Sequence, residues 1–223
     1  MNAAPQRKLP AALTETLCTA LTLLVFSVVS AALLAGAYRI TRIDIERSEQ
    51  QEKIRLLSQV LPSQGFDNDP IRDAHTLAVD ALLGLKRPSQ AFVATRNGQA
   101  VAVVLEAAAP DGYAGEIRLL VGIDASGRLI GVRVTSHKET PGLGDYIEAG
   151  KSAWIRQFAG RSLDTPDAEG WQVRKDGGRF DYVAGATITP RAVVKAVHKT
   201  LRYFAAHRQT LLRPPHAPKG APP

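Results

Sequence analysis

Two glycine-rich segments hold the residues of this chain that are best suited to contact a ligand. The first runs from His137 to Asp145 and reads His-Lys-Glu-Thr-Pro-Gly-Leu-Gly-Asp. It follows a predicted strand, and its glycines allow positive φ and a close approach of the backbone to a bound molecule. Backbone N–H groups in such a loop can bind a phosphate or the edge of a flavin. Spacing alone favours an ordinary turn that exposes His137 and Glu139.

The second segment joins a predicted strand to a predicted helix and reads Gly-Ala-Thr-Ile-Thr-Pro-Arg from Gly185 to Arg191. We expect Thr189 to be the N-cap of this helix, with Pro190 at the first helical position. The small residues before Thr187 leave room around its hydroxyl. A phosphate on that hydroxyl would lie near the positive end of the helix. Local chemistry alone again favours an ordinary turn.

The composition gives little support for a disulfide, a metal site, a dinucleotide-binding unit or nucleic-acid binding. Cys18 is the single cysteine, which excludes an intrachain disulfide and a cysteine-built zinc or iron–sulfur site within this chain. No metal site is predicted, and no Gly-x-Gly-x-x-Gly follows a strand to suggest a dinucleotide-binding unit. The formal net charge of +7 comes without a run of five basic residues, so we expect no nucleic-acid binding. Redox chemistry would therefore need an organic cofactor or histidine and carboxylate ligands.

The N-terminal part contains a segment long enough to span a membrane. Residues 17–38 are 22 residues without a charged side chain. As a helix they reach about 33 Å, enough for a hydrocarbon core of roughly 30 Å. Residues 35–37, Ala-Gly-Ala, imitate a signal-peptidase site, but the apolar stretch exceeds that of a signal peptide and we favour an uncleaved anchor. Basic residues flank both sides, so their count barely decides the orientation.

Beyond the anchor, the pattern predicts an α+β domain whose strands form antiparallel hairpins with helices before and after. Asn97-Gly98 is a strong hairpin signal between strands at 91–95 and 99–105. A second hairpin is expected between strands at 117–123 and 129–135. We further expect helices at 43–60, 74–85, 152–158 and 190–208 and strands at 171–174 and 180–183.

Spacing alone predicts ordinary turns for both glycine-rich segments, but a family resemblance favours a ligand-binding role. The Glu-Thr-Pro-Gly-Leu-Gly of residues 139–144 and the Gly-Ala-Thr of residues 185–187 resemble the FMN-binding domain of the G subunit of the Rnf (Rsx) electron-transport complex. They are also similar to the C subunit of the sodium-translocating NADH:quinone reductase, which is the main alternative. The likeness extends to residues 66–69, 112–117 and 154–155, in the same order and spacing. Lys138 and residues 66–69 favour the Rnf family.

The resemblance implies covalently bound FMN. In that family a separate flavin transferase esterifies FMN, through its phosphate, to the last threonine of an Asp-x-x-(Ser/Thr)-Gly-Ala-Thr motif. Here the motif begins at Asp181 and makes Thr187 the attachment residue, with Thr189 as the fallback. Ala184 stands where Ser or Thr is usual, and we expect this small residue to be tolerated. The other expected flavin contacts are Gly185, Ala186, Thr189, Glu139, Thr140, Gly142, Leu143 and Gly144. Tyr113 and Trp154 are expected to be packing residues.

The implied organisation is one N-terminal transmembrane helix followed by an antiparallel-hairpin FMN-binding domain flanked by helices. We divide the chain into an N-terminal arm and anchor, a juxtamembrane region of helices and linker, the FMN-binding domain and a Pro-rich tail that we expect to be disordered. The boundaries are 1–16 for the arm, 17–38 for the anchor, 39–90 for the juxtamembrane region, 91–210 for the domain and 211–223 for the tail.

The implied function is that of an electron-transfer subunit in a complex that couples ferredoxin/NAD-type electron transfer to ion translocation. Its partners would be the other membrane and peripheral subunits and the flavin transferase, and no independent catalytic activity or catalytic residue is expected. We expect a bacterial inner membrane with the soluble domain on the periplasmic side, because a covalent bond removes the dependence on scarce free FMN there. A flavin-free membrane-anchored scaffold or sensor domain is the alternative of a different class.

Overall fold

The computed structural model describes residues 11–61 and 65–213. It divides into two compact units, residues 1–51 and 52–223, each of which is considered by itself. The N-terminal ten residues and most of the tail at 211–223 lie outside the described residues, so the expected disorder of the tail stays a prediction.

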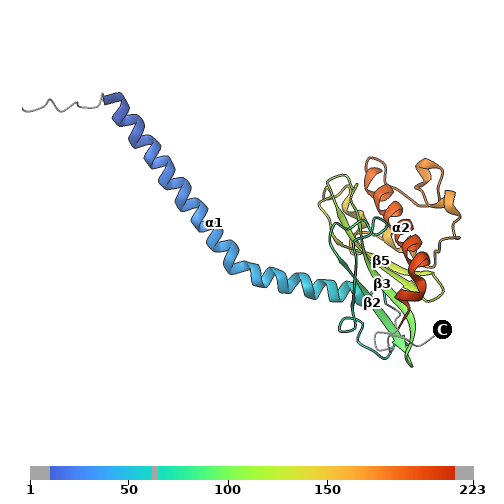
Figure 1. The fold of residues 1–223 in the computed structure, drawn as a ribbon. Coiled ribbons are helices and arrows are strands. Elements are labelled where there is room, and N and C mark those ends of the chain that lie inside the picture. The colour runs from blue at the N-terminus through green and yellow to red at the C-terminus, as the bar shows by residue number, and fades with distance from the viewer. Residues whose placement is uncertain (1–10, 62–64, 214–223) are drawn as a thin grey trace, which may run out of the picture. The chain divides into compact units, whose positions relative to one another are not determined.

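A single long helix, α1, spans Ala11–Ser58 (Figure 1). Its segment Leu13–Arg42 is long and apolar enough to cross a membrane. Large side chains in this segment are exposed, for example Leu21 at 61% and Phe26 at 75%. Lipid is the environment that such an apolar surface requires. This confirms the expected apolar helix, and the helix predicted at 43–60 is its continuation.

The second unit is built on a five-stranded antiparallel sheet in the sequential order β1-β2-β3-β4-β5. The bounds are β1 His75–Leu77, β2 Ser89–Arg96, β3 Gln99–Ala109, β4 Ile117–Asp124 and β5 Leu129–Ser136. Both predicted hairpins are confirmed. Asn97 and Gly98 turn β2 into β3 with φ of 50° and 74°, the left-handed conformations that a tight hairpin turn needs. The α+β fold class is therefore confirmed.

The helix predicted at 74–85 is wrong. Residues 75–77 form β1, which pairs with β2, and turns follow it. Asp80 stabilises these turns, since its Oδ1 accepts the N–H of Leu82 at 2.7 Å. The carbonyl of Leu83 then accepts the N–H of Ala108 at 2.8 Å. The apolar residues of this segment are thus buried by a strand that joins the sheet and by the turn that follows it. No helix is needed to bury them.

The strands predicted at 171–174 and 180–183 are also wrong. Strand-type pairing between the two segments is limited to an isolated bridge between Val173 and Phe180, so they form no ladder. The 3₁₀-helix η4, Arg174–Asp176, lies between them and ends at Gly177, whose φ is 89°. The tight turn places Val173 and Phe180 in the core, where both are at most 1% exposed.

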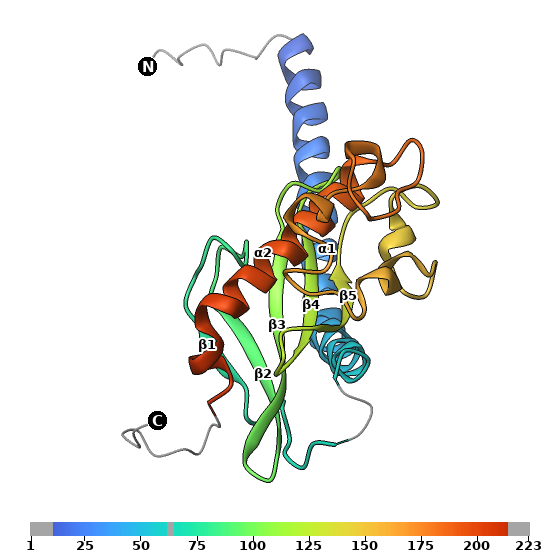
Figure 2. The same cartoon turned by 90° about the vertical axis from the view of Figure 1, so that its right-hand side faces the viewer.

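Two apolar layers cover the two faces of the sheet. Helix α2, Ile188–Leu211, crosses one face (Figure 2) and contributes buried residues that include Val193, Val197 and Leu201. The predicted helix at 190–208 is thereby confirmed. The 3₁₀-helices η1, Asp145–Ile147, and η2, Trp154–Phe158, add Ile147, Ile155 and Phe158 to this layer. A third, η3, spans Ala168–Gly170. Helix η2 corresponds to the short helix predicted at 152–158.

The last turns of α1 and the residues just after its end form the layer on the other face. Leu57 and Val60 are at most 2% exposed and pack with Phe92, Val104 and Leu120 of the sheet. Val60 approaches so closely that a Cβ on Gly122 of β4 would lie 2.0 Å from its carbonyl oxygen. Only glycine fits beneath this turn.

This contact gives a matched pair of substitutions. Gly122 pairs with Gly131 of β5, where an added Cβ meets nothing closer than 3.6 Å. We expect Gly122→Ala to lower the free energy of unfolding by about 3 kcal/mol, because the Val60 backbone must move. Gly131→Ala should change it by less than about 1 kcal/mol. Urea titration of the full chain in non-ionic micelles, followed by tryptophan fluorescence, measures both; equal costs would contradict the close approach.

Candidate functional site

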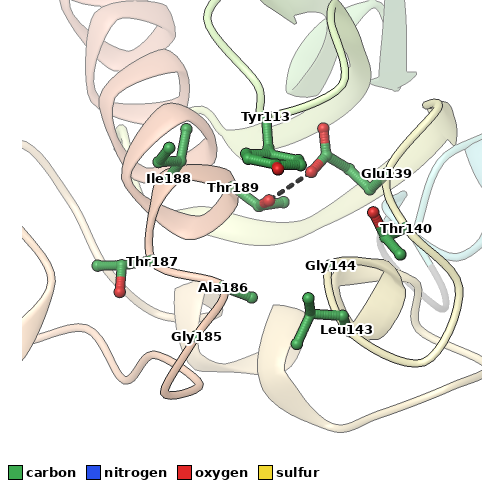
Figure 3. A pocket seen from close by; sticks show the side chains of 10 residues that line it. All are labelled: Tyr113, Glu139, Thr140, Leu143, Gly144, Gly185, Ala186, Thr187, Ile188 and Thr189. Atoms are coloured by element: carbon green, nitrogen blue, oxygen red, sulfur yellow. Dashed lines mark hydrogen bonds between the residues drawn. The ribbon is translucent and has the colours of Figure 1, made fainter.

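The two glycine-rich segments come together at one hollow of about 110 Å³ (Figure 3). Eight of the nine residues predicted for the site line it, and Gly142 does not. Tyr113 and Ile188 line it as well. The complete lining is Tyr113, Glu139, Thr140, Leu143, Gly144, Gly185, Ala186, Thr187, Ile188 and Thr189.

The carboxyl group of Glu139 joins the three segments that surround the hollow. Its Oε2 accepts a hydrogen bond from the hydroxyl of Thr189, at the start of α2. Its Oε1 accepts the N–H of Ala114, in the loop after β3, at 3.0 Å. Glu139 is only 4% exposed, so the expected solvent-exposed position is wrong. A buried carboxyl group needs such donors, and each of them comes from a different segment.

Thr189 is not the N-cap that the sequence suggested. Helix α2 begins at Ile188 with Thr187 in the cap position, so Thr189 lies within the first turn. It is 1% exposed, and its hydroxyl is used by Glu139. The buried carboxyl group of Glu139 needs a hydrogen-bond donor, and Thr189 supplies it. The backbone N–H groups that an N-cap would bind can be bound by water at an exposed helix end.

The Thr187 hydroxyl is chemically different from that of Thr189. Thr187 is partly exposed, and its side chain makes no capping hydrogen bond. This hydroxyl forms no hydrogen bond with the residues that the structure describes. A turn leads to Thr187. Gly185 has a φ of 88° in this turn, and the N–H of Ala186 donates to the carbonyl of Val183 at 3.1 Å. A free hydroxyl thus stands at the N-terminus of a 24-residue helix.

Tyr146 attaches this turn to the rest of the domain. Its hydroxyl accepts the N–H of Val183 and donates to the carbonyl of Ala186, both at 3.4 Å. Burial raises the pKa of Tyr146 to about 12, so the phenol keeps its proton for this bond at neutral pH. Trp154 packs edge-on against Tyr146 and donates its indole N–H to the carbonyl of Asp181 at 2.6 Å. The packing role expected for Trp154 agrees with these contacts.

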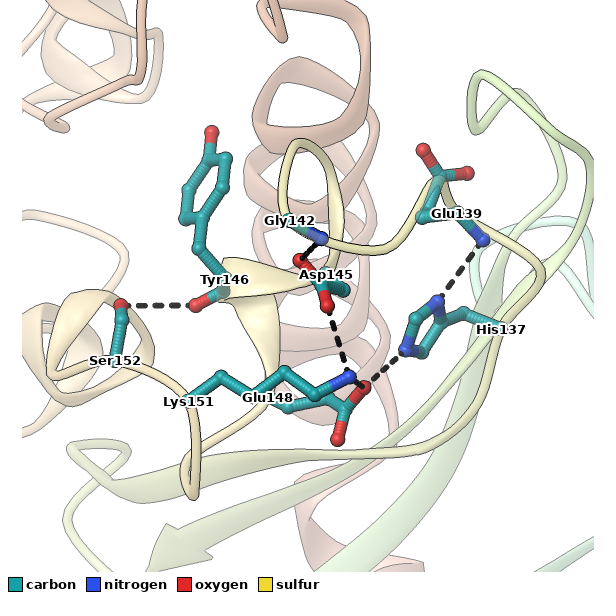
Figure 4. Close-up of polar contacts among 8 residues, drawn as sticks. All are labelled: His137, Glu139, Gly142, Asp145, Tyr146, Glu148, Lys151 and Ser152. Carbon is teal, nitrogen blue, oxygen red and sulfur yellow. Dashed lines mark hydrogen bonds and ion pairs between the residues drawn. The ribbon is translucent and has the colours of Figure 1, made fainter.

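Hydrogen bonds hold the loop at residues 139–144 in a tight turn. The N–H groups of Leu143 and Gly144 bind the carbonyl of Thr140 at 3.1 and 2.9 Å. The N–H of Gly142 binds Oδ1 of Asp145 at 2.9 Å, and the other oxygen of Asp145 pairs with Lys151 at 2.9 Å (Figure 4). The Lys151 ammonium, together with the Gly142 N–H, holds the pKa of Asp145 below its ordinary value.

His137 lies inside this network instead of pointing into solvent. Its Nδ1 accepts the N–H of Glu139 at 3.0 Å, and its Nε2 contacts Oε1 of Glu148 at 2.8 Å. Neutral His137 therefore carries its proton on Nε2. Burial raises the pKa of Glu148, but the hydrogen bonds from Lys151 and His137 outweigh it and leave this pKa below its ordinary value. The histidine has a structural role in the loop (Figure 4).

Tyr113 is the residue that sequence reasoning misjudged most clearly. It is 67% exposed at the rim of the hollow, so the packing role expected for it is wrong. Its position between two glycines, Gly112 and Gly115, was the available signal. Gly112 cannot be larger, because a Cβ there would lie 2.3 Å from the Gly115 carbonyl oxygen.

The turn at Gly142 gives a second matched pair. Gly142 has φ of 76°, and Gly150 has an ordinary φ; a Cβ at either position meets no atom within 4 Å. We expect Gly142→Ala to lower the free energy of unfolding by about 1–2 kcal/mol, because only backbone strain is added. Gly150→Ala should stay within about 0.5 kcal/mol of the unaltered chain. Urea unfolding of the full chain in micelles compares them, and a harmless Gly142→Ala would argue against the left-handed turn.

Known proteins that are similar to this chain cover almost its whole length. Residues 112–202 match the model of the FMN-binding domain, and residues 12–60 match that of the RnfG N-terminal region. The G subunit of the ion-translocating oxidoreductase complex of Pseudomonas aeruginosa is 49% identical over 97% of this chain and 98% of its own length. The corresponding G subunits of Vibrio cholerae and Cereibacter sphaeroides are 46% and 50% identical, over 90% and 89% of this chain and 95% and 88% of their own lengths. The chain belongs to the family of G subunits of the ion-translocating oxidoreductase (Rnf) complexes.

Proposed function

We propose that the chain carries FMN as a phosphoester on Thr187 and passes electrons within an Rnf-type complex. The observation that carries the proposal is the contrast between two neighbouring hydroxyls. Thr187 has a partly exposed hydroxyl without a hydrogen-bond partner among the described residues. Thr189 is buried and donates to Glu139. Only the first is free to become the oxygen of an ester.

The residues around Thr187 fit a flavin phosphate. The phosphate would lie beside the first turn of α2, whose unpaired N–H groups and dipole favour an anion. Gly144 keeps the hollow open, since a Cβ there would lie 3.0 Å from Glu139 and 3.2 Å from the Thr189 hydroxyl. Tyr113 and Leu143, 67% and 43% exposed, provide apolar surface at the rim for an aromatic ring system.

Attachment would be the work of a separate transferase with FAD as the flavin donor. The Thr187 oxygen forms a new bond to the phosphorus of the FMN moiety, and the bond between the two phosphates of FAD breaks. AMP leaves, and the hydroxyl proton passes to solvent. Residues 181–185 are exposed and therefore accessible to another enzyme. Ala184 is among them and has no packing role, which supports its tolerance in the motif.

Family membership makes the chain a membrane-anchored electron-transfer subunit of an ion-translocating oxidoreductase, with an FMN-binding domain. When bound, FMN supplies one- and two-electron transfer, and the protein holds it and keeps its phosphate in place. We propose that the complex exchanges electrons with a ferredoxin-type protein at one end of its series of redox cofactors and with NAD at the other. Residues 17–38 contain no charged side chain, so we assign the ion path to other subunits.

Thr187 gives the direct test of attachment. The full chain, co-expressed with a flavin transferase that acts in the bacterial periplasm, should give a fluorescent band on a denaturing gel under ultraviolet light. Thr187→Ala should abolish this band, because no oxygen remains to form the ester. Thr187→Ser is the matched control and should keep it.

Two further variants separate the alternatives. Fluorescence that persists in Thr187→Ala and disappears in Thr189→Ala would move the attachment site to Thr189. A dark band for every variant, with and without the transferase, would favour the flavin-free scaffold. Ala184→Ser should reach the same final fluorescence as the unaltered chain, because residue 184 only has to keep the turn open.

We also propose that the domain after the anchor faces the periplasm from the bacterial inner membrane. Fusion of alkaline phosphatase to the C-terminus should give an active enzyme, since this reporter needs an oxidising compartment to form its disulfides. The matched fusion with a fluorescent protein that matures only in the cytoplasm should stay dark. The opposite pair of results would place the domain in the cytoplasm.

A further inference from the structure

A second, larger hollow on the domain is distinct from the one at the proposed flavin site. It measures about 520 Å³ and shares no lining residue with the hollow at Thr187. The last turns of α1, strand β5 and the segments around residues 149 and 156 surround it. Its lining residues are Glu52, Arg55, Leu56, Gln59, Arg133, Val134, Thr135, Ser136, His137, Glu148, Ala149, Gly150 and Arg156.

Both acidic residues that line this hollow are already paired. The two oxygens of Glu52 accept from Nε and Nη2 of Arg55 at 2.9 and 2.8 Å. Oε1 of Glu148 contacts Nε2 of His137 at 2.8 Å and Nζ of Lys151 at 2.7 Å. Neither carboxylate is therefore available to neutralise a further cation in the hollow.

Two arginines of the lining have no acidic partner among the described residues. Arg133 is half-buried; its Nε donates to the side-chain oxygen of Gln59 at 2.7 Å and its Nη1 to the carbonyl of Val132 at 2.8 Å. Both acceptors are neutral. Arg156 is exposed, and its guanidinium forms no ion pair with any residue that the structure describes.

The two guanidinium groups also repel each other. Burial, and then the charge of Arg156, lower the pKa of Arg133 from its ordinary value. An arginine side chain nevertheless keeps its proton in proteins, so both guanidinium groups are charged, and an anion bound in the hollow would relieve their repulsion. The planar guanidinium fork matches the oxygens of a phosphate group, and two of them can bind one phosphate from two sides.

We propose that Arg133 and Arg156 form a binding site for a phosphate group in this hollow. The site is independent of the flavin, because Thr187 and the hollow around it contribute nothing to it. Two sources share the chemistry, the headgroup of an anionic phospholipid and a soluble phosphate.

Calorimetric titration of the full chain in non-ionic micelles tests the site at constant ionic strength. Inorganic phosphate is the first probe, with acetate as the control anion. Short-chain phosphatidylglycerol, below its micellar concentration, is the second, with short-chain phosphatidylcholine as its control. We expect Arg156→Gln and Arg133→Gln each to weaken phosphate binding about tenfold or more, as loss of a hydrogen bond to a charged group does. Arg179→Gln, an exposed arginine outside the hollow, should bind like the unaltered chain.

Each outcome has a definite meaning. Tighter binding of phosphatidylglycerol than of phosphatidylcholine, lost in Arg156→Gln, supports the site with a lipid headgroup as its ligand. Binding of inorganic phosphate alone, with the same loss, supports it with a soluble phosphate. No binding of either probe, equal binding of acetate and phosphate, or an Arg156→Gln variant that binds like the unaltered chain would overturn the proposal. Because Arg156 is exposed, its substitution tests the site even where Arg133→Gln impairs folding.

Discussion

The position of one buried carboxyl group determines how the hollow at Thr187 is built. Glu139 accepts hydrogen bonds from Ala114 and Thr189, and so connects the loop after β3, the glycine-rich loop after β5 and the first turn of α2. A carboxyl group that is 4% exposed would be costly without these donors. The three segments are therefore fixed relative to one another, and the turn that presents Thr187 is fixed with them.

Features that depend on local chemistry could be predicted from the sequence. The hairpin at Asn97-Gly98 follows from residues that adopt positive φ. The apolar segment predicted at 17–38 follows from composition and lies within the candidate span Leu13–Arg42. The helix expected at 74–85 failed for a different reason. Its apolar spacing also suits a short edge strand followed by turns, and pairing with β2 decides between the two.

The details of the site depended on contacts between distant parts of the chain. Thr189 has the residue type and neighbour of an N-cap, but Glu139, 50 positions earlier, takes its hydroxyl and places it in the core. His137 similarly contacts Glu148 instead of solvent. The family resemblance, and not spacing, nominated the eight residues that line the hollow. It did not show that Glu139 takes the hydroxyl of Thr189. The exposed Tyr113 was missed because a lone aromatic residue more often packs in the core.

The sequential order of the sheet has a consequence for how the domain is made. Every strand pairs with its neighbour in the chain, so the sheet can form from local hairpins with little cost in loop closure. Helix α2 follows all five strands in the chain and covers one face of that sheet. The hollow includes the first turn of α2, so during synthesis it is completed only after all five strands have been made. A chain truncated or stalled before residue 188 has all five strands of the sheet but lacks the first turn of α2. An enzyme that modifies Thr187 in its folded setting would therefore not act on such a chain.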